Sequence, residues 1–96
     1  MYGMIGRMTA TPGQRDTLLA ILLEGTSDMP GCRSYVIAVE PGDADAIWIT
    51  EVWDSKELHD ASLALPAVRA AIAKARPIIA GFGPSTVTEV VGGVGL

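Results

Sequence analysis

The sequence predicts an α+β fold with strands and helices in the order β-α-β-β-α-β. Four segments have the β-branched, aromatic or alternating composition of strands, and two others carry apolar residues at helical spacing. A short turn joins the two middle strands, whereas a helix separates each outer strand from this pair. This order is that of the split βαβ unit, in which a four-stranded antiparallel sheet carries both helices on one face.

The first strand is predicted over Tyr2–Ala10, and the Thr-Pro-Gly-Gln sequence after it indicates a helix start. Thr11 is the expected N-cap, with the proline at the first helical position. Four leucines follow at helical spacing and predict one apolar stripe, formed by Leu18, Leu19, Leu22 and Leu23. We expect this helix to end at Gly25, before a loop rich in Ser, Asp, Pro and Gly.

The middle strands are predicted over Arg33–Glu40 and Ala46–Trp53. The Pro-Gly-Asp-Ala-Asp sequence between them is typical of a turn, so the two strands should pair as an antiparallel hairpin. Asp54, with a glutamate three residues later, resembles a capping box that starts a helix at Ser55. Pro66 should break and restart this helix, because proline is tolerated in the first turn but not in the interior.

The end of the chain is predicted to hold the last strand. Pro77 should bend or end the second helix, residues 81–84 form a connector, and Ser85–Val91 is the fourth strand. With 96 residues, of which 49% are apolar, the chain is expected to be a single domain. Its core should span residues 2–91, and the glycine-rich residues 92–96 should be a flexible tail.

Charge and composition argue against several classes of function. The net charge of −4 and the seven scattered basic residues argue against nucleic-acid binding, which needs clustered Lys and Arg. A single cysteine, Cys32, cannot form an internal disulfide, and no second cysteine is present to build a metal site. No apolar run approaches the roughly 20 residues of a membrane span, and no signal peptide is recognisable. We therefore expect a cytoplasmic protein that binds neither membrane nor nucleic acid.

Each predicted strand carries apolar residues on both faces. Ile47 and Ile49 lie on one face of the third strand, and Trp48 and Val52 lie on the other. Helices cover only one face of a split βαβ sheet, so the second face would be a large exposed apolar patch. Packing two such sheets face to face covers this patch, which predicts a homodimer through the open sheet face.

Four features in this order resemble the antibiotic biosynthesis monooxygenase family of dimeric α+β barrel proteins. They are the Pro-Gly-x-Arg helix start, the sequences MPGCRSY and EVWDSKE, and the broken second helix. The resemblance implies a ferredoxin-like domain whose dimer closes into a β-barrel, with a pocket between each sheet and its own helices. Members of the family oxidise anthrols or quinols with O₂ and without metal, flavin or haem, and other members degrade haem.

The sequence departs from the family pattern at two places. Many members have a histidine nine residues after the strand-end tryptophan, where this chain has Ser62, and its histidine occurs one turn earlier as His59. Haem-degrading members use an Asn-Trp-His triad, but this chain has no asparagine and carries Ser62 and Ile72 at the matching helix positions. These differences argue against haem degradation by that mechanism.

A cofactor-free oxygenase must bind a flat phenol, favour its deprotonation and exclude water. Trp53 is a candidate wall for the aromatic ring, or a core residue with a satisfied N–H. Glu51 lies on the same strand face and is a candidate base, unless it lies at an edge or pairs with Arg7 or Arg33. His59 is a second candidate proton acceptor, or else part of the solvated face of its helix.

Five further residues are candidates for substrate binding, and each has a structural alternative. Tyr35 is able to hydrogen-bond a ring substituent or to pack across strands, and Met4 suits either a pocket for flat ligands or the core. Ser62 and Leu63 share the helical face of His59. Arg76 would pair with an anionic substrate, unless it is simply solvated.

Two functions of different classes follow. The first is a cofactor-independent monooxygenase, without metal or other cofactor, that acts with O₂ on a small quinol or polycyclic phenol. The alternative is a non-catalytic dimeric barrel that binds a small hydrophobic molecule or has a structural or stress-related role. The two differ in whether His59 and Glu51 point inward beside Trp53, which depends on the strand face that meets the helices.

Overall fold

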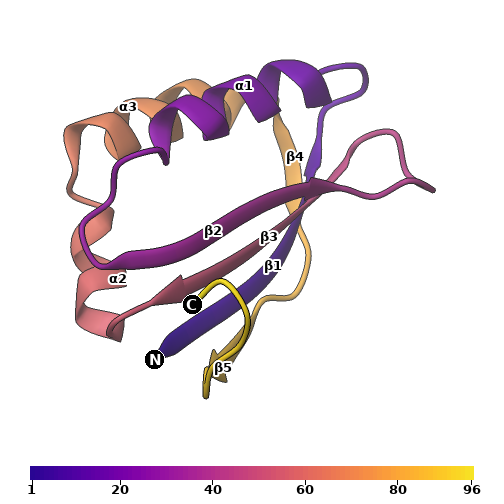
Figure 1. The fold of residues 1–96 in the computed structure, drawn as a ribbon. Helices are drawn as coiled ribbons and strands as arrows, with labels where there is room; N and C mark the ends of the chain where they lie inside the picture. Colours follow the sequence, from indigo (N-terminus) through magenta and orange to yellow (C-terminus); the bar gives the residue numbers. More distant parts are fainter.

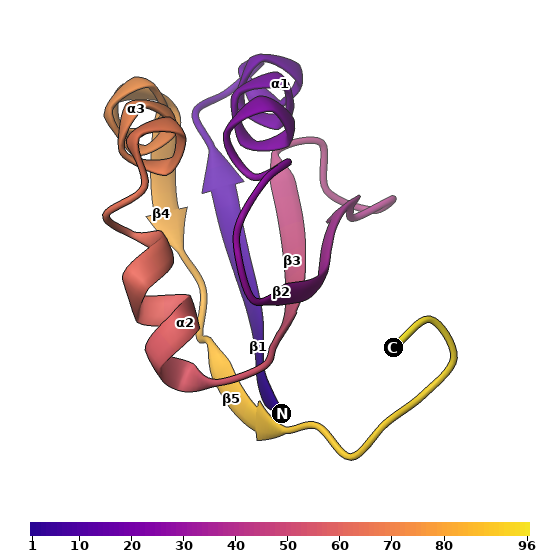
Figure 2. The same ribbon diagram turned by 60° about the vertical axis from the view of Figure 1, so that its left-hand side comes forward.

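Five antiparallel strands form one sheet, and three α-helices lie on one of its faces (Figures 1 and 2). The computed structural model describes residues 1–96. The elements are β1 (Tyr2–Ala10), α1 (Arg15–Gly25), β2 (Cys32–Val39), β3 (Ala46–Trp53), α2 (Lys56–Ser62), α3 (Pro66–Ala75), a 3-10 turn (Arg76–Ile78), β4 (Ile79–Phe82) and β5 (Thr86–Glu89). This arrangement confirms the predicted α+β fold, including the paired middle strands and the restart of the second helix at Pro66.

The order of strands across the sheet is β2-β3-β1-β4, with β5 also paired to β1. Along β3, the side chains of Ile47, Ile49 and Trp53 are buried beneath the helices, whereas Trp48 on the opposite face remains 38% exposed. Successive strand residues point to opposite faces, so Glu51 also points toward the helices. The structure therefore decides which strand face meets the helices.

The first helix begins three residues later than predicted. Thr11 does not cap it; instead the Gln14 amide donates to the Thr11 carbonyl at 3.0 Å and closes a turn. Proline at the second position and glycine at the third, with a Gly13 φ of +79°, are typical of a type II turn. A left-handed glycine cannot continue into a right-handed helix, so α1 starts at Arg15.

The second helix also begins one residue later than predicted. Its N-cap is Ser55 and not Asp54, because the Ser55 hydroxyl accepts a hydrogen bond from the Leu58 amide at 3.2 Å. Asp54 instead pairs with Arg33 on the neighbouring strand. Because the Asp54 carboxylate pairs with Arg33, it does not cap the helix as the local sequence predicts.

The predicted fourth strand is shorter than expected, and an additional strand precedes it. The expected connector at residues 81–84 is wrong in part, because residues 79–82 form β4 and pair with the end of β1. After β4 the regular pairing with β1 is interrupted at Gly83, although the Gly83 amide still donates to the Arg7 carbonyl at 2.7 Å. Pairing resumes with β5, which lies beside the start of β1. β5 therefore lies within the predicted strand Ser85–Val91, whereas β4 was not predicted.

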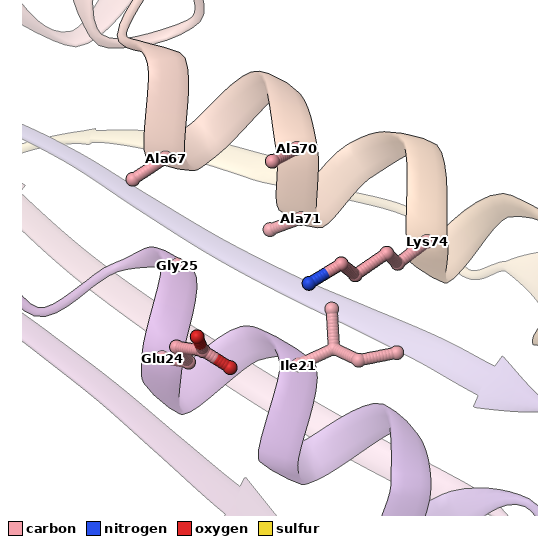
Figure 3. A pocket seen from close by; sticks show the side chains of 7 residues that line it. All are labelled: Ile21, Glu24, Gly25, Ala67, Ala70, Ala71 and Lys74. Carbon is pink, nitrogen blue, oxygen red and sulfur yellow. The ribbon is translucent and has the colours of Figure 1, made fainter.

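The helix layer is held together by small residues. Gly25 of α1 faces Ala67 and Ala71 of α3 (Figure 3), and the gap between the two helices has a volume of about 60 Å³. A Cβ atom on Gly25 would lie only 2.4 Å from the Ala71 Cβ atom and 3.3 Å from the Ala67 carbonyl oxygen. Of the predicted leucine stripe, Leu18 is fully buried and Leu23 turns outward.

The opposite face of the sheet is not covered by any helix (Figure 2). Ile5, Val36 and Trp48 all point to this face and remain more than a third exposed. Arg7 crosses the same face and forms ion pairs with Glu40 at 3.1 Å and Asp43 at 2.9 Å. None of the three helices is long and apolar enough to cross a membrane.

The close contact between α1 and α3 makes the Gly25→Ala substitution destabilising. Alanine normally stabilises a helix by about 1 kcal/mol relative to glycine, but overpacking costs about 1–3 kcal/mol. Here the added methyl would overlap Ala71, so we expect the free energy of unfolding to fall by about 1–2 kcal/mol in urea denaturation.

The matched control is Gly42→Ala, because no atom lies within 4 Å of a Cβ at that position. We expect it to change the free energy of unfolding by less than about 0.5 kcal/mol. A Gly25→Ala protein as stable as the wild type would contradict the close packing of the two helices.

Candidate functional site

Trp53 is the anchor of a polar cluster at one end of the helix-covered face. It closes β3, is 1% exposed, and packs in a small apolar cluster with Met29 and Val68. Its indole N–H donates to a Glu51 carboxylate oxygen at 3.0 Å. Trp53 is therefore a buried residue with a satisfied N–H, and its hydrogen bond fixes the position of the Glu51 carboxylate.

Glu51 is directed inward and is not paired with a permanent cation. Its side chain is 13% exposed, and it lies between Met4 of β1 and Tyr35 of β2 in the strand register. The expected alternative pairing with Arg7 or Arg33 does not occur, because those residues bind acidic groups elsewhere. The cationic side chain nearest to its carboxylate would be His59 in its protonated form.

His59 reaches this carboxylate from α2. Its Nε2 atom lies 3.7 Å from a Glu51 oxygen, and its ring packs edge-on against Trp53 and beside Tyr2 at centroid distances of 5.5 and 5.3 Å. The histidine side chain is only 14% exposed. His59 and Glu51 thus both point inward beside Trp53, the alternative that the sequence left open.

Asp60 orients the imidazole from the solvent side, a role that the sequence did not suggest. The His59 Nδ1 atom lies 3.0 Å from an Asp60 oxygen, and the other Asp60 oxygen accepts from Lys56 at 2.7 Å. The hydrogen bond from Lys56, and after it the one with His59, lowers the pKa of Asp60. A carboxylate only accepts hydrogen bonds, so Nδ1 carries the hydrogen and the Nε2 lone pair faces Glu51. The site therefore places a carboxylate and an imidazole nitrogen within 3.7 Å of each other.

A large apolar cavity lies between the sheet and α3, beside this cluster. Its volume is about 510 Å³, within the range of small-molecule sites, and eleven of its thirteen lining residues are apolar. The apolar walls include Met8, Ile49, Val68, Ile72, Ile79 and Phe82. Of the predicted site residues, Tyr35, Leu63 and Arg76 line the cavity, whereas Glu51, Trp53 and His59 lie outside its lining.

Tyr35 connects the cavity to the polar cluster. It lines the cavity and is paired with Glu51 across the β2–β3 ladder, and its hydroxyl makes no hydrogen bond within the chain. Burial, followed by the nearby Glu51 charge, raises the pKa of Tyr35 well above its usual range. The side chain therefore offers the cavity a neutral hydroxyl donor.

The remaining predicted residues support the cluster without lining the cavity. Met4 is half-buried beside Glu51 in the strand register. Ser62 is 5% exposed and donates its hydroxyl hydrogen to the His59 carbonyl at 2.6 Å. No group of three or more His, Cys, Asp and Glu side chains is placed to hold a metal ion.

Comparisons with known proteins agree with the fold. Residues 1–74 match the family model described as antibiotic biosynthesis monooxygenase. A crystal structure from Chloroflexus aurantiacus J-10-fl, named for the same family, is 64% identical to the chain; the match covers 96% of this chain and 94% of that one, with a TM-score of 0.94. No curated protein sequence matches the chain.

More distant structures show the fold alone. Rv0793 from Mycobacterium tuberculosis is 21% identical, with a TM-score of 0.80 and 97% of each chain covered. A protein from Caulobacter crescentus CB15 is 17% identical, with a TM-score of 0.84 and 95% of this chain and 90% of that one covered. At such identities the likeness extends to architecture and not to chemistry.

The raised pKa of Tyr35 predicts a loss of stability in alkali. Between its ordinary value of 10.0 and its raised value, the unfolded chain releases the phenol proton while the folded chain retains it. The free energy of unfolding should therefore fall as the pH rises above about 10. We expect a larger fall between pH 9 and 11 for the wild type than for Tyr35→Phe, measured by urea denaturation at each pH.

Tyr2→Phe is the control, because it removes the other tyrosine and leaves Tyr35 in place. It should retain the alkaline decline of the wild type. Equal declines in the wild type and Tyr35→Phe would show that the phenol ionises as readily in the folded protein as in the unfolded chain.

Proposed function

Because the chain belongs to the antibiotic biosynthesis monooxygenase family, we propose that it oxidises a small quinol or polycyclic phenol with O₂, without a metal, flavin or haem. The observation that carries the proposal is the inward-facing Glu51–His59 pair beside Trp53, next to a large apolar cavity. A proton acceptor and a dry space for a flat ring are the two parts that this chemistry needs.

In the proposed reaction the phenol lies in the cavity with its hydroxyl group near Tyr35. The Tyr35 hydroxyl, which has no partner in the chain, donates to the substrate oxygen and holds it at the end of the cavity next to Glu51. The Glu51–His59 pair accepts the phenol proton, and Asp60 keeps the imidazole in the tautomer that accepts it. Trp53 positions the carboxylate.

The phenolate then reduces O₂ directly, because an anionic ring is a better electron donor than the neutral phenol. One oxygen atom is added to the ring carbon, and the other leaves as water. The overall reaction converts a phenol and O₂ to a quinone and water, with no external reductant. The apolar cavity walls would keep bulk water from the intermediate.

The alternative function is the binding of a small hydrophobic molecule without chemistry. It is favoured by one observation, that Glu51 and His59 lie beside the cavity and outside its lining. This arrangement would leave a bound ring in contact with Tyr35 and apolar side chains only. Turnover, and not binding, distinguishes the two functions.

We also propose that two copies of the chain pack through their open sheet faces. Support comes from Ile5, Val36 and Trp48, which are exposed on the one sheet face that no helix covers. Removing these apolar side chains from water favours association. The face opposite the cavity would then form the dimer interface, and each copy would keep its own site.

The first experiment measures O₂ uptake by the purified, metal-free protein with a panel of hydroquinones and anthrols. We expect uptake above autoxidation by the wild type and a fall of about 100-fold or more in kcat for Glu51→Gln or His59→Gln, since general base catalysis contributes about 10²–10⁴-fold.

Glu57→Gln is the matched control, because Glu57 is exposed on the same helix as His59 and makes no hydrogen bond through its side chain. It should leave uptake unchanged. Saturable binding of the aromatic compounds without uptake above background would favour the non-catalytic alternative.

The dimer is tested by placing a charge on the open sheet face. Val36→Lys should convert the dimer to a monomer in sedimentation velocity, because a lysine would be buried between two apolar sheets. Leu23→Lys, at an equally exposed leucine on α1, should leave the dimer intact. Dissociation in both variants, or in neither, would place the interface elsewhere.

A further inference from the structure

One charged side chain lines the apolar cavity, and it belongs to Arg76. Arg7, Arg33 and Lys56 each form an ion pair within the chain, whereas Arg76 forms neither an ion pair nor a side-chain hydrogen bond. Thr26, the other polar residue of the lining, donates its hydroxyl hydrogen to the Leu22 carbonyl. Arg76 is exposed to solvent, as its structural alternative predicted, and it also lines the cavity without a partner. Its guanidinium is therefore the free charged group available to a molecule that enters this cavity.

The cavity spans the width of the sheet, and Arg76 lies at the end opposite to Tyr35. Its lining includes Tyr35 on β2, Ile49 on β3, Met8 on β1 and Phe82 on β4, in the order of the strands across the sheet. Three strand spacings correspond to about 14 Å. Arg76 follows the last residue of α3 and is the first residue of the 3-10 turn that leads into β4, so it is placed at the β4 end.

The two ends of the cavity therefore offer different chemistry. The β2 end has the neutral Tyr35 hydroxyl and the acceptors Glu51 and His59 behind it, and the β4 end has a permanent cation. An anion in an apolar cavity needs a partner of opposite charge, and a planar guanidinium binds a carboxylate through two parallel hydrogen bonds. Because the net charge of the chain is −4, attraction of an anion would depend on this local cation.

We infer that the ligand of this cavity is a flat, apolar ring compound with a carboxylate at the end remote from its hydroxyl group, and that Arg76 binds this carboxylate. The assignment of the hydroxyl to the Tyr35 end rests on the proposed function. The binding of the carboxylate by Arg76 needs no turnover, so it is testable even if the protein is not an enzyme.

The test uses two probes that differ only in charge, 6-hydroxy-2-naphthoate and its neutral amide, 6-hydroxy-2-naphthamide. Isothermal titration calorimetry at neutral pH measures the Kd of both for the full-length protein. We expect the wild type to bind the carboxylate at least tenfold more tightly than the amide. Arg76→Gln should remove this preference, and Arg76→Lys should restore part of it.

Arg69→Gln is the matched control, because Arg69 is an exposed and unpaired arginine on α3, the helix that precedes Arg76, and does not line the cavity. It should retain the preference of the wild type for the carboxylate. Equal affinity of the wild type for the two probes would overturn the inference. So would a preference that survives Arg76→Gln, or the absence of binding by both probes.

Turnover, if it is found, separates this inference from the proposed function. Arg76→Gln should then raise the KM for the carboxylate substrate by a larger factor than the KM for the neutral amide. A loss of kcat for both substrates would place Arg76 at the reacting phenolate and overturn the inference. A charge preference in binding with no O₂ uptake would support the inference and contradict the oxygenase function.

Discussion

The alternation of side chains along β3 is the constraint on which the rest of the structure depends. Ile47 and Ile49 enter the main core under α1, and Glu51 and Trp53 continue the same face into the polar cluster under α2. Because the side-chain period of a strand is two, a shift of one residue would bury Trp48 and expose both the core and the cluster. The stability of the sheet and the placement of the candidate site therefore rest on one register.

Burial of the Glu51 carboxylate costs free energy, and the neighbouring side chains offset part of this cost. A polar group removed from water without partners costs about 1–3 kcal/mol, and more when it is charged. Here the Trp53 N–H donates to it at 3.0 Å, and His59, 3.7 Å away, would form an ion pair with it when protonated. A purely structural position would be filled at lower cost by an apolar residue, as at Ile47 and Ile49 of the same strand face. This contrast is the physical reason to regard the cluster as functional.

Much of the candidate site was predictable because its residues are close in sequence. Glu51, Trp53 and His59 lie within nine positions of the sequence. The turn from β3 into α2 brings His59 back over Glu51 and Trp53. The role of Asp60 was not predictable, since an exposed acidic residue next to a histidine is also typical of a solvated helix face. The cavity walls from Met8, Ile79 and Phe82 depend on how β1 and β4 pair beneath α3, and local sequence carries no signal of that pairing.

The sequence by itself determined the order of the elements, the β2–β3 hairpin, the restart of the helix at Pro66 and the apolar character of both sheet faces. These features depend on backbone preferences and on periodicities that act within a few residues. Tertiary structure alone decided which sheet face the helices cover, where the helices begin and that an additional strand, β4, precedes the last one. It did so because the hydrogen bonds and ion pairs concerned join distant residues: Gly13 with Asp45, Asp54 with Arg33, and Gly83 with Arg7.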